Sequence, residues 1–568
     1  MTELFIEPLK YYNQEGKQTH QQNCEEHFQT LLEKSGVDAD ENRKTVQEYN
    51  AELEIIKNLS KILSKFKFLR VLLIIAIIIG SIFALASVGL FSSETGKAIL
   101  FLLLGIGLIV GSSILLVQKI APKIKDVDAQ KSQHTETAEK LLATAWKQVA
   151  PLNALFTDLD SIRLIEKTIP EFSFDDKFTK QREHFFIHQY DFLDLQNEEC
   201  SMVDTLSGTF AGNPFLFGRR RVHSLGTANY TGHLTITWTE TYTDSQGNRR
   251  RIQRTQVLTA TVTKPKPYYH YNTFLAYGCQ AAPDLTFSRT CQHAERWDEK
   301  KLERKIKRGE GKLQRKAEKA MRKGGNFQEM ANSEFDVLFG ASDRDHEVQF
   351  RLMYTPLAQQ NTVALITDKE NFGDDFRFSK YRRFNVITSD HAQNWNMNTS
   401  ASNYHSYDID QIKSKFIDFN HNFFKSIFFD FAPMFSVPAY LEEPCASMED
   451  IEEYPQNYTY YEHEVMANSF GYHNFEHEDS HTEAILKTHA LEKDETSDTV
   501  EVTAYSYTTC ERVDFVPVLG GDGRIHNVPV PWTEYIPVSK TSQARIFGTT
   551  AEAHANQPSY HGMNISTI

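Results

Sequence analysis

The sequence predicts an α+β protein that is anchored in a membrane by a hairpin of two helices. Residues 71–91 and 98–117 are apolar runs without a charged residue, and each is about as long as the 20 residues with which a helix crosses a bilayer. Beyond residue 200, stretches of alternating polarity are interleaved with stretches of helical periodicity. We therefore expect a transmembrane helical hairpin with an antiparallel helical stalk, joined to a cytosolic domain of antiparallel β-hairpins and amphipathic helices.

The residues that flank the two apolar runs predict their orientation. Basic residues precede the first run and follow the second: Lys57, Lys61, Lys65, Lys67 and Arg70, then Lys119, Lys123 and Lys125. The connection, Ser92–Lys97, holds only Glu94 and Lys97 as charges. Because Lys and Arg are retained on the cytoplasmic side, we expect a two-span plasma-membrane protein with both termini in the cytoplasm. The alternative is a buried helical pair in a soluble protein, where uncharged runs of this length are rare.

Changes in composition divide the chain into five expected segments. They are cytosolic N-terminal helices in 1–70, the two-span hairpin in 71–117, a membrane-proximal helix in 118–157, a cytosolic α+β domain in 158–441, and an acidic segment with a C-terminal β-hairpin in 442–568. The six cysteines are scattered without a CxxC pair, which predicts neither disulfides nor a Cys-based zinc site and fits a reducing compartment. The net charge of −14 argues against nucleic-acid binding by the whole chain.

Long helices are expected on both sides of the spans. A helix over 18–34 ends at Ser35-Gly36, and Asp38 with Glu41 resembles a capping box that starts a helix running into the first span. Apolar stripes mark both arms: Tyr49, Leu53, Ile56, Leu59, Leu63 and Phe66, then Ala138, Leu141, Ala145 and Val149. Either the two stripes meet in a stalk, or each packs on the globular domain. Pro122 should kink the second arm near the membrane.

The β-rich part begins with a long hairpin over 233–263, in which Thr residues alternate with apolar ones around the turn Asp244–Asn248. Counting back from this turn places Trp238 near Arg254, which predicts a cation–π pair. Prolines in Lys264–Pro267 should end the second strand. Further expected elements are a strand over Phe376–Ile387, an amphipathic helix over Asp408–Phe429, and a closing hairpin of Val500–Val518 and Val528–Val538 around Gly520–Gly523.

A charged helix over 292–323 carries 13 basic and 6 acidic residues. Gly309 and Gly311 should weaken its middle. Such a helix suits anionic lipid headgroups or RNA, and it lacks the interleaved aromatic residues that stack on bases, so lipid is the favoured partner. A solvated helix without a partner is the alternative.

One catalytic motif occurs in the acidic segment. Residues 477–481, HEDSH, match HExxH, in which two histidines on one helix face bind Zn²⁺ and the glutamate polarises the metal's water. His473 precedes His477 by one helical turn, and Glu483, Glu492 or Glu501 would supply a further ligand to His477 and His481. Glu476, Asp479 and Ser480 make the motif polar all round, and a solvated acidic segment with a chance match is favoured over a zinc hydrolase and over adventitious metal binding.

Residues 334–366, EFDVLFGASDRDHEVQFRLMYTPLAQQNTVALI, are expected to form a strand, a polar turn, a second strand and a helix that Thr355 caps and Pro356 opens. Together with the two spans and the hairpin at 233–263, this part resembles a family of bacterial two-pass membrane proteins with a cytosolic α+β domain and no known activity. The resemblance implies location and domain type only.

These observations favour a membrane-anchored interaction, assembly or accessory protein without catalysis, and no catalytic, cofactor-binding or metal-binding residue is assigned. The alternative is a membrane-tethered zinc hydrolase using residues 477–481. Gly107 and Gly111 form a GxxxG pair that would let a second copy pair through the span, or would seat the first span, where Gly80, Ala84 and Ser87 are small, against the second. Uncharged spans make a self-contained transporter unfavourable.

Overall fold

The computed structural model describes residues 3–90, 95–193, 197–243, 246, 248–393, 397–442, 458–493, 497–548, 559–560 and 563–567. Ser92–Glu94 of the expected connection, Asp244, Ser245 and Gly247 of the expected turn, and 443–457 of the acidic segment lie outside these residues. The chain is α+β and forms two compact units. One unit comprises 1–23, 158–400 and 420–568, and the other comprises 24–157 and 401–419.

The smaller unit is built on two long helices. Helix α3 (Lys17–Ser35) ends before Gly36, whose φ of 64° is left-handed. Asp38 then caps α4 (Ala39–Leu90): its Oδ1 accepts the backbone N–H groups of Asp40 and Glu41 at 3.0 and 3.1 Å. The second long helix consists of α5 (Thr95–Leu115), a π-helical turn η2 (Leu116–Ile120) and α6 (Ala121–Asn153). Pro122 lies at the start of α6, directly after this π-helical turn.

Contacts along α4 show that it packs antiparallel to the second long helix. Gln148 Nε2 donates to Thr45 Oγ1 at 3.0 Å, His134 Nδ1 lies 2.6 Å from Glu52 Oε2, and Lys123 lies 5.6 Å from the Phe66 ring centroid. As the residue number rises along α4, the number of the contacted residue on the second helix falls, so the two helices run antiparallel. Of the expected first stripe, Leu63 is buried, Leu53 has 40% of its area exposed and Tyr49 packs on Tyr407.

The apolar parts of this helix pair are long and apolar enough to cross a membrane, and only 11% of each most apolar window is buried. The helices approach most closely at Gly80 and Gly105: a Cβ on Gly105 would lie 2.7 Å from the Gly80 carbonyl oxygen. Gly107 and Gly111 have open space where a Cβ would lie. The interpretation that the Gly107–Gly111 groove seats the first helix is therefore wrong. Gly105, on another face of α5, contacts the first helix instead.

The larger unit contains two antiparallel sheets. The first has the order β1-β2-β3-β4-β7-β6-β5 and the second β11-β12-β10-β9-β8. The bounds are β1 (Phe172–Phe174), β2 (Cys200–Phe210), β3 (Asn213–Thr243), β4 (Arg249–Gly278), β5 (Thr286–Arg289), β6 (Phe376–Tyr381), β7 (Phe384–Ser389), β8 (Ile485–Lys493), β9 (Ser497–Leu519), β10 (Ile525–Gly548), β11 (Ser559–Tyr560) and β12 (Met563–Thr567). The single strand expected over Phe376–Ile387 is two strands, because Arg382 adopts φ 55° in a tight turn between them.

Most helices of this unit lie before, between or after the strands of the first sheet in the chain, and two of them stand where strands were expected. They are α1 (Glu3–Ile6), α2 (Pro8–Tyr11), η1 (Tyr12–Gly16), α7 (Asp160–Thr168), α8 (Lys180–Tyr190), α9 (Glu299–Arg322), α10 (Ser333–Phe339), α11 (Glu347–Met353), α12 (Pro356–Thr367), α13 (Asp390–Gln393) and the second half of α14 (Ile409–Phe435). The two strands expected within 334–354 are the helices α10 and α11. Buried Phe335, Leu338 and Phe339 have helical spacing, and Asn332 caps α10 by accepting the N–H of Phe335 at 3.1 Å.

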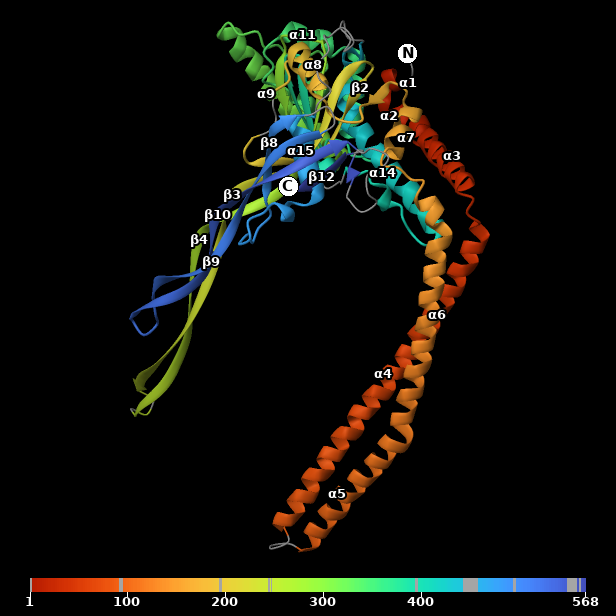
Figure 1. Ribbon diagram of the computed structural model, residues 1–568. Helices are drawn as coiled ribbons and strands as arrows, with labels where there is room; N and C mark the ends of the chain where they lie inside the picture. Colours follow the sequence, from red (N-terminus) through yellow and green to blue (C-terminus); the bar gives the residue numbers. More distant parts are fainter. Residues whose placement is uncertain are drawn as a thin grey trace. The chain divides into compact units, whose positions relative to one another are not determined.

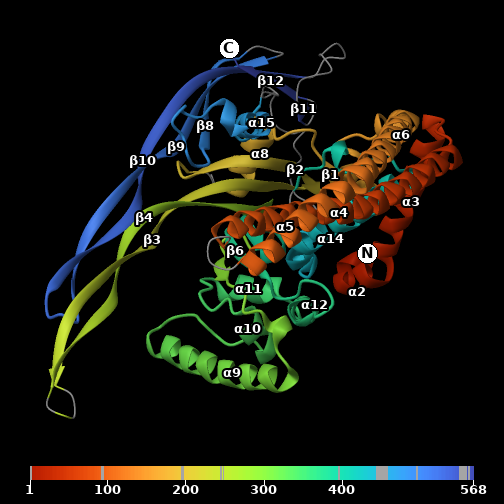
Figure 2. The same cartoon turned by 90° about the horizontal axis from the view of Figure 1, so that it is seen from below.

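Two β-hairpins that are far apart in sequence form a two-layer arm (Figures 1 and 2). Strands β3 and β4 make the first layer, and β9 and β10 make the second. Ile236, Leu258, Ala260, Val528 and Val530 are buried between them. Gly232 allows the layers to touch, because a Cβ there would lie 2.0 Å from the Pro529 carbonyl oxygen.

The register of the first layer is as expected, but two details differ. Trp238 lies opposite Arg254, yet the Arg254 Nε donates to Glu240 Oε2 at 3.0 Å instead of facing the indole. Strand β4 does not end at Lys264–Pro267 and continues to Gly278. In the described chain, β4 pairs with β7 only from Leu275 to Gly278, so the prolines lie where one edge of the strand has no partner to receive an N–H.

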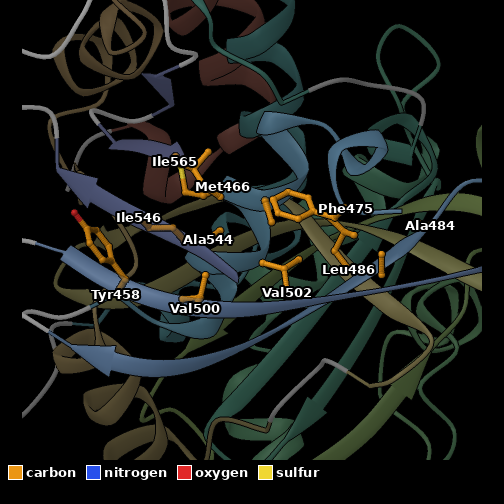
Figure 3. Close-up of a cluster of buried hydrophobic side chains, with 12 residues drawn as sticks. Tyr458, Met466, Phe475, Ala484, Leu486, Val500, Val502, Ala544, Ile546 and Ile565 are labelled. Carbon is orange, nitrogen blue, oxygen red and sulfur yellow. The ribbon is translucent and has the colours of Figure 1, made fainter. Parts of the chain in front are cut away.

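Helix α15 (Tyr460–Phe470) lies between the two sheets and packs apolar residues on the second (Figure 3). Buried around it are Met466, Leu486, Val500, Val502, Ala544, Ile546 and Ile565. On its other side, Tyr461 and Val465 belong to an apolar cluster with residues of the first sheet. It also makes polar contacts: Glu462 Oε1 accepts the N–H of Phe178 at 2.8 Å, and His463 Nε2 lies 2.9 Å from Asp498 Oδ2. The described part of the acidic segment is therefore not uniformly solvated, since α15 is part of the core.

Candidate functional site

Helix α9 is strongly basic. It spans Glu299–Arg322 and contains eleven basic and four acidic residues. Asp298 caps it, with Oδ1 accepting the N–H of Lys301 at 2.7 Å. The helix expected over 292–323 is thus shorter at its start, where residues 292–298 form a loop with a short 3-10 turn, η3 (Ala294–Arg296). A chain of net charge −14 carries on α9 a surface of the opposite sign.

The two glycines of α9 do not interrupt it, and they have different surroundings. Gly309 faces α10: a Cβ on it would lie 2.4 Å from Val337 Cγ1. Gly311 has open space there. Leu313, one turn beyond Gly309, is buried. Gly309 therefore lets α9 lie directly against α10, and the expected weak point is a close packing contact.

An open cavity of about 320 Å³ lies between α9 and α10. We call it the basic cavity. Four of its lining residues are basic, at spacings that put them on one face of α9: Lys305, Arg308, Lys312 and Lys316. The opposite wall comes from α10 and the turn after it, including Gly340 and Ser342.

Two of the four cations around the basic cavity, Arg308 and Lys312, have no partner in the described structure, whereas Lys305 lies over the Trp297 ring. Asp336, the acidic residue in its wall, is neutralised by Arg344, whose Nη1 lies 2.6 Å from Asp336 Oδ1. Lys316 donates to the Ser342 carbonyl oxygen. Arg308 and Lys312 form no ion pair within the described parts of the chain. A group with several anionic oxygens, such as a phosphate, would fit this arrangement of cations.

A second surface lies on the outer face of the arm. Exposed apolar residues alternate with inward-facing ones along β9 and β10: Val513, Phe515, Leu519 and Ile525, of which Ile525 has 71% of its area exposed. They oppose one another across the strands, as Leu519 opposite Ile525 and Phe515 opposite Pro529. We call this the outer apolar face. Contiguous exposed apolar area of this kind marks interaction surfaces.

A third hollow, a cleft of about 530 Å³, lies at the base of the arm. Three ionisable groups of its wall have partners. His223 contacts Glu199 through Nδ1, and Lys487 Nζ lies 2.5 Å from Glu464 Oε1. Burial raises the pKa of Tyr269 in its wall to about 12, so this phenol stays protonated. Glu198, also in the wall, is exposed.

The HExxH motif at 477–481 is not on a helix. It lies in the turn between η7 (Tyr472–Asn474) and β8, so its histidines do not share a helix face. His481 is occupied by the sheet: its N–H donates to the Tyr507 carbonyl oxygen at 2.9 Å, and its Nδ1 accepts the Thr509 N–H at 3.1 Å. His477 Nδ1 accepts the N–H of Asp479.

The remaining residues of the motif are also used elsewhere. His473 Nδ1 lies 3.0 Å from Glu476 Oε1, and Glu483, an expected third ligand, pairs with Arg221. Glu478 is exposed in the turn. The zinc-hydrolase geometry is thus missing from this segment. Within the described chain a different trio, Cys291, His293 and Asp390, brings metal-ligating atoms together.

The comparisons with known proteins leave the site to be argued from its geometry. No family model, curated protein or solved structure matches the chain. The basic character of α9 was evident from the sequence. The cavity was not evident from the sequence, because Val337, Gly340 and Ser342 lie in a stretch where the pattern predicts strands and the structure has helices.

Proposed function

We propose that this protein is a membrane-anchored interaction protein without catalysis, whose soluble parts face the cytoplasm and bind anionic phosphate headgroups through α9. The anchor is supported by the two long apolar helices, whose apolar side chains are exposed on several sides: Val71, Leu72, Ile75, Ile78 and Ile82 on α4, and Leu100, Leu103, Leu104 and Val110 on α5. Side chains of this kind are stable in lipid and unstable in water.

The observation that carries headgroup binding is the basic cavity with its two unpaired cations, Arg308 and Lys312. Each Lys or Arg near an anionic surface contributes about 1 kcal/mol of attraction. RNA is the less favoured ligand, because the aromatic residue nearest to the start of α9, Trp297, is buried under Lys301 and Lys305 and offers no face for base stacking.

Vesicle binding tests this proposal. The full chain is reconstituted into neutral nanodiscs and mixed with free vesicles that contain either neutral lipid alone or a fraction of phosphatidylserine. We expect binding to the anionic vesicles, weakening as salt rises because headgroup attraction is screened. Equal binding to neutral vesicles, or none to either, would rule out headgroup recognition, and binding of RNA alone would reassign α9 to nucleic acid.

Matched charge variants locate the contact. Arg308→Ala with Lys312→Ala removes the two unpaired cations of the cavity, whereas Arg304→Ala with Arg322→Ala removes the same charge elsewhere on α9. We expect the first pair to weaken vesicle binding by about 30-fold, in line with the loss of two headgroup contacts, and the second pair to weaken it less. Equal losses would show that the cavity plays no part in the contact.

The outer apolar face favours a second function, docking of a partner protein on the arm. Exposed Glu511 borders this face and exposed Asn527 lies within it, opposite Pro517, so apolar and polar contacts alternate as in protein interfaces. A photo-crosslinking residue at Phe515 should form one discrete protein adduct in native membranes, and Leu519→Lys should abolish it. An adduct only to lipid, or one that Leu519→Lys leaves unchanged, would contradict protein docking.

A further inference from the structure

The topology of the first sheet brings three metal-ligating residues to one edge. Strands β5 and β7 flank β6 and are both antiparallel to it, with Arg289 opposite Phe378 and Ser389 opposite Phe376. The carboxyl ends of β5 and β7 therefore meet at the start of β6. Cys291 and His293 follow β5, and Asp390 follows β7.

The ligand atoms of these residues lie at the spacing of a metal site. Cys291 Sγ lies 3.8 Å from His293 Nε2, which lies 3.7 Å from Asp390 Oδ2, and all three atoms are within 4.8 Å of one another. Tetrahedral Zn²⁺ with its usual bond lengths would place sulfur and nitrogen about 3.6 Å apart and nitrogen and oxygen about 3.4 Å apart. The sulfur–nitrogen and nitrogen–oxygen distances are thus within a few tenths of an ångström of these values.

A buried ion pair fixes the loop that carries Cys291 and His293. Arg289 contacts Asp374 through Nη2, and both side chains are fully buried. Asp374 Oδ2 also accepts the backbone N–H groups of Gln292 at 2.9 Å and Ala294 at 3.1 Å. The loop is thus wrapped around one carboxylate. His293 lies between these two bonds with a φ of 55°, so its backbone is held in place without any metal.

The outer contacts of the trio resemble the second shell of a metal site. Arg377 Nη1 lies 2.8 Å from Asp390 Oδ1, which leaves Oδ2 for the trio. The His293 Nδ1 and the Glu295 Oε2 are both buried and lack a hydrogen-bond partner, while Glu295 Oε1 lies 3.7 Å from that Nδ1. A small shift would let Nδ1–H donate to Glu295, the contact that orients a histidine whose Nε2 binds a metal.

We propose that Cys291, His293 and Asp390 bind one Zn²⁺ ion through Sγ, Nε2 and Oδ2. Zinc accepts all three ligand types, and a set of three protein ligands leaves the fourth position to water. The thiol proton of Cys291 passes to solvent as the zinc–sulfur bond forms. The site is independent of α9 and of headgroup binding.

Metal binding by the full chain in detergent tests the proposal. The protein is stripped with a chelator, dialysed against Zn²⁺ and analysed for metal, and Co²⁺ is then used as a spectroscopic probe. We expect one Zn²⁺ per chain and a cobalt–thiolate charge-transfer band. Cys291→Ser should abolish the band and weaken Zn²⁺ binding by more than about tenfold, since even outer contacts of metal sites contribute that much.

Control variants separate this site from other ligands. Cys510→Ser removes another partly exposed thiol, and His477→Gln with His481→Gln removes the HExxH histidines; both should bind Zn²⁺ as the parent does. The thermal midpoint in chelator identifies variants that fail to fold, and His293→Gln replaces Cys291→Ser in that case. No zinc in the parent, a band that survives Cys291→Ser, or a band lost with Cys510→Ser would overturn the proposal.

Discussion

At the scale of single residues, buried ionisable groups of α15 contact residues of both sheets. Glu462 is fully buried, with Oε1 accepting the Phe178 N–H and the Thr205 hydroxyl, while Oε2 has no partner in the described structure. Burial raises the pKa of this carboxyl to about 7, and the two hydrogen bonds only partly offset it. The charged form is therefore costly in the fold.

Replacing Glu462 with glutamine should remove a pH dependence of stability. The folded pKa of about 7 lies above the usual 4.5, so the folded chain binds more protons between these values and the free energy of unfolding falls as pH rises through them. The fall amounts to about 3 kcal/mol in all. Urea unfolding of the detergent-solubilised chain at pH 4.5–8 should show this fall in the parent and not in Glu462→Gln.

Glu478→Gln, in an exposed turn, is the matched control and should follow the parent at every pH. Parallel curves for the parent and Glu462→Gln would contradict the buried-carboxyl argument. Sequence alone could not identify Glu462, because it belongs to a segment with many acidic residues and its neighbours, Phe178 after β1 and Thr205 in β2, lie more than 250 positions away.

At the scale of elements, periodicity predicted the strands and helices whose conformation depends on their own sequence. The long hairpin was found with its register, down to Trp238 opposite Arg254, because the alternation continues on both sides of one turn. The end of β4 was predicted wrongly, because whether a proline is tolerated depends on the partner strand at that edge. The helices α10 and α11 were missed because a short apolar run does not distinguish a strand from a helix.

The glycines of α9 give an element-scale prediction with an internal control. Gly309→Ala would force a Cβ to within 2.4 Å of Val337, and overpacking of this kind destabilises by about 1–3 kcal/mol. Gly311→Ala meets no neighbour and should stabilise the chain by about 1 kcal/mol through helix propensity. Denaturation midpoints of the two variants should therefore move in opposite directions.

Val337→Ala tests whether the clash is the cause. Combined with Gly309→Ala it should restore much of the lost stability, because the smaller side chain makes room for the new methyl group. If Gly309→Ala stabilises the chain as Gly311→Ala does, the close packing of α9 on α10 is not formed.

The span glycines give a second prediction at this scale. Gly107 and Gly111 face open space, whereas Gly105 contacts Gly80 and Ala84. If two copies pair through the open glycines, Gly107→Ile should lower the yield of cross-linked dimer without affecting insertion, since isoleucine is more apolar than glycine. Gly105→Ile should instead disturb the contact within the chain. An unchanged dimer yield, or no dimer in the parent, would exclude pairing through Gly107.

At the scale of the whole molecule, the two units were only partly predictable. The helical pair follows from two apolar runs and two stripes that lie in sequence order. The two-layer arm does not, because β3 and β9 are separated by more than 250 residues and each hairpin alone reads as having one buried face. The trio of Cys291, His293 and Asp390 was missed for the same reason, since it depends on the order of β5, β6 and β7.

Membrane orientation is the prediction that involves the whole chain. If Lys and Arg flanks hold both soluble units in the cytoplasm, a cysteine placed at Ser93, which lies outside the described residues, should react with a membrane-impermeant thiol reagent in intact cells. Cys510 is the native reporter, because it is partly exposed whereas Cys279 is buried. It should react only after the cells are permeabilised. Labelling of Cys510 but not of the Ser93→Cys thiol in intact cells would reverse the orientation.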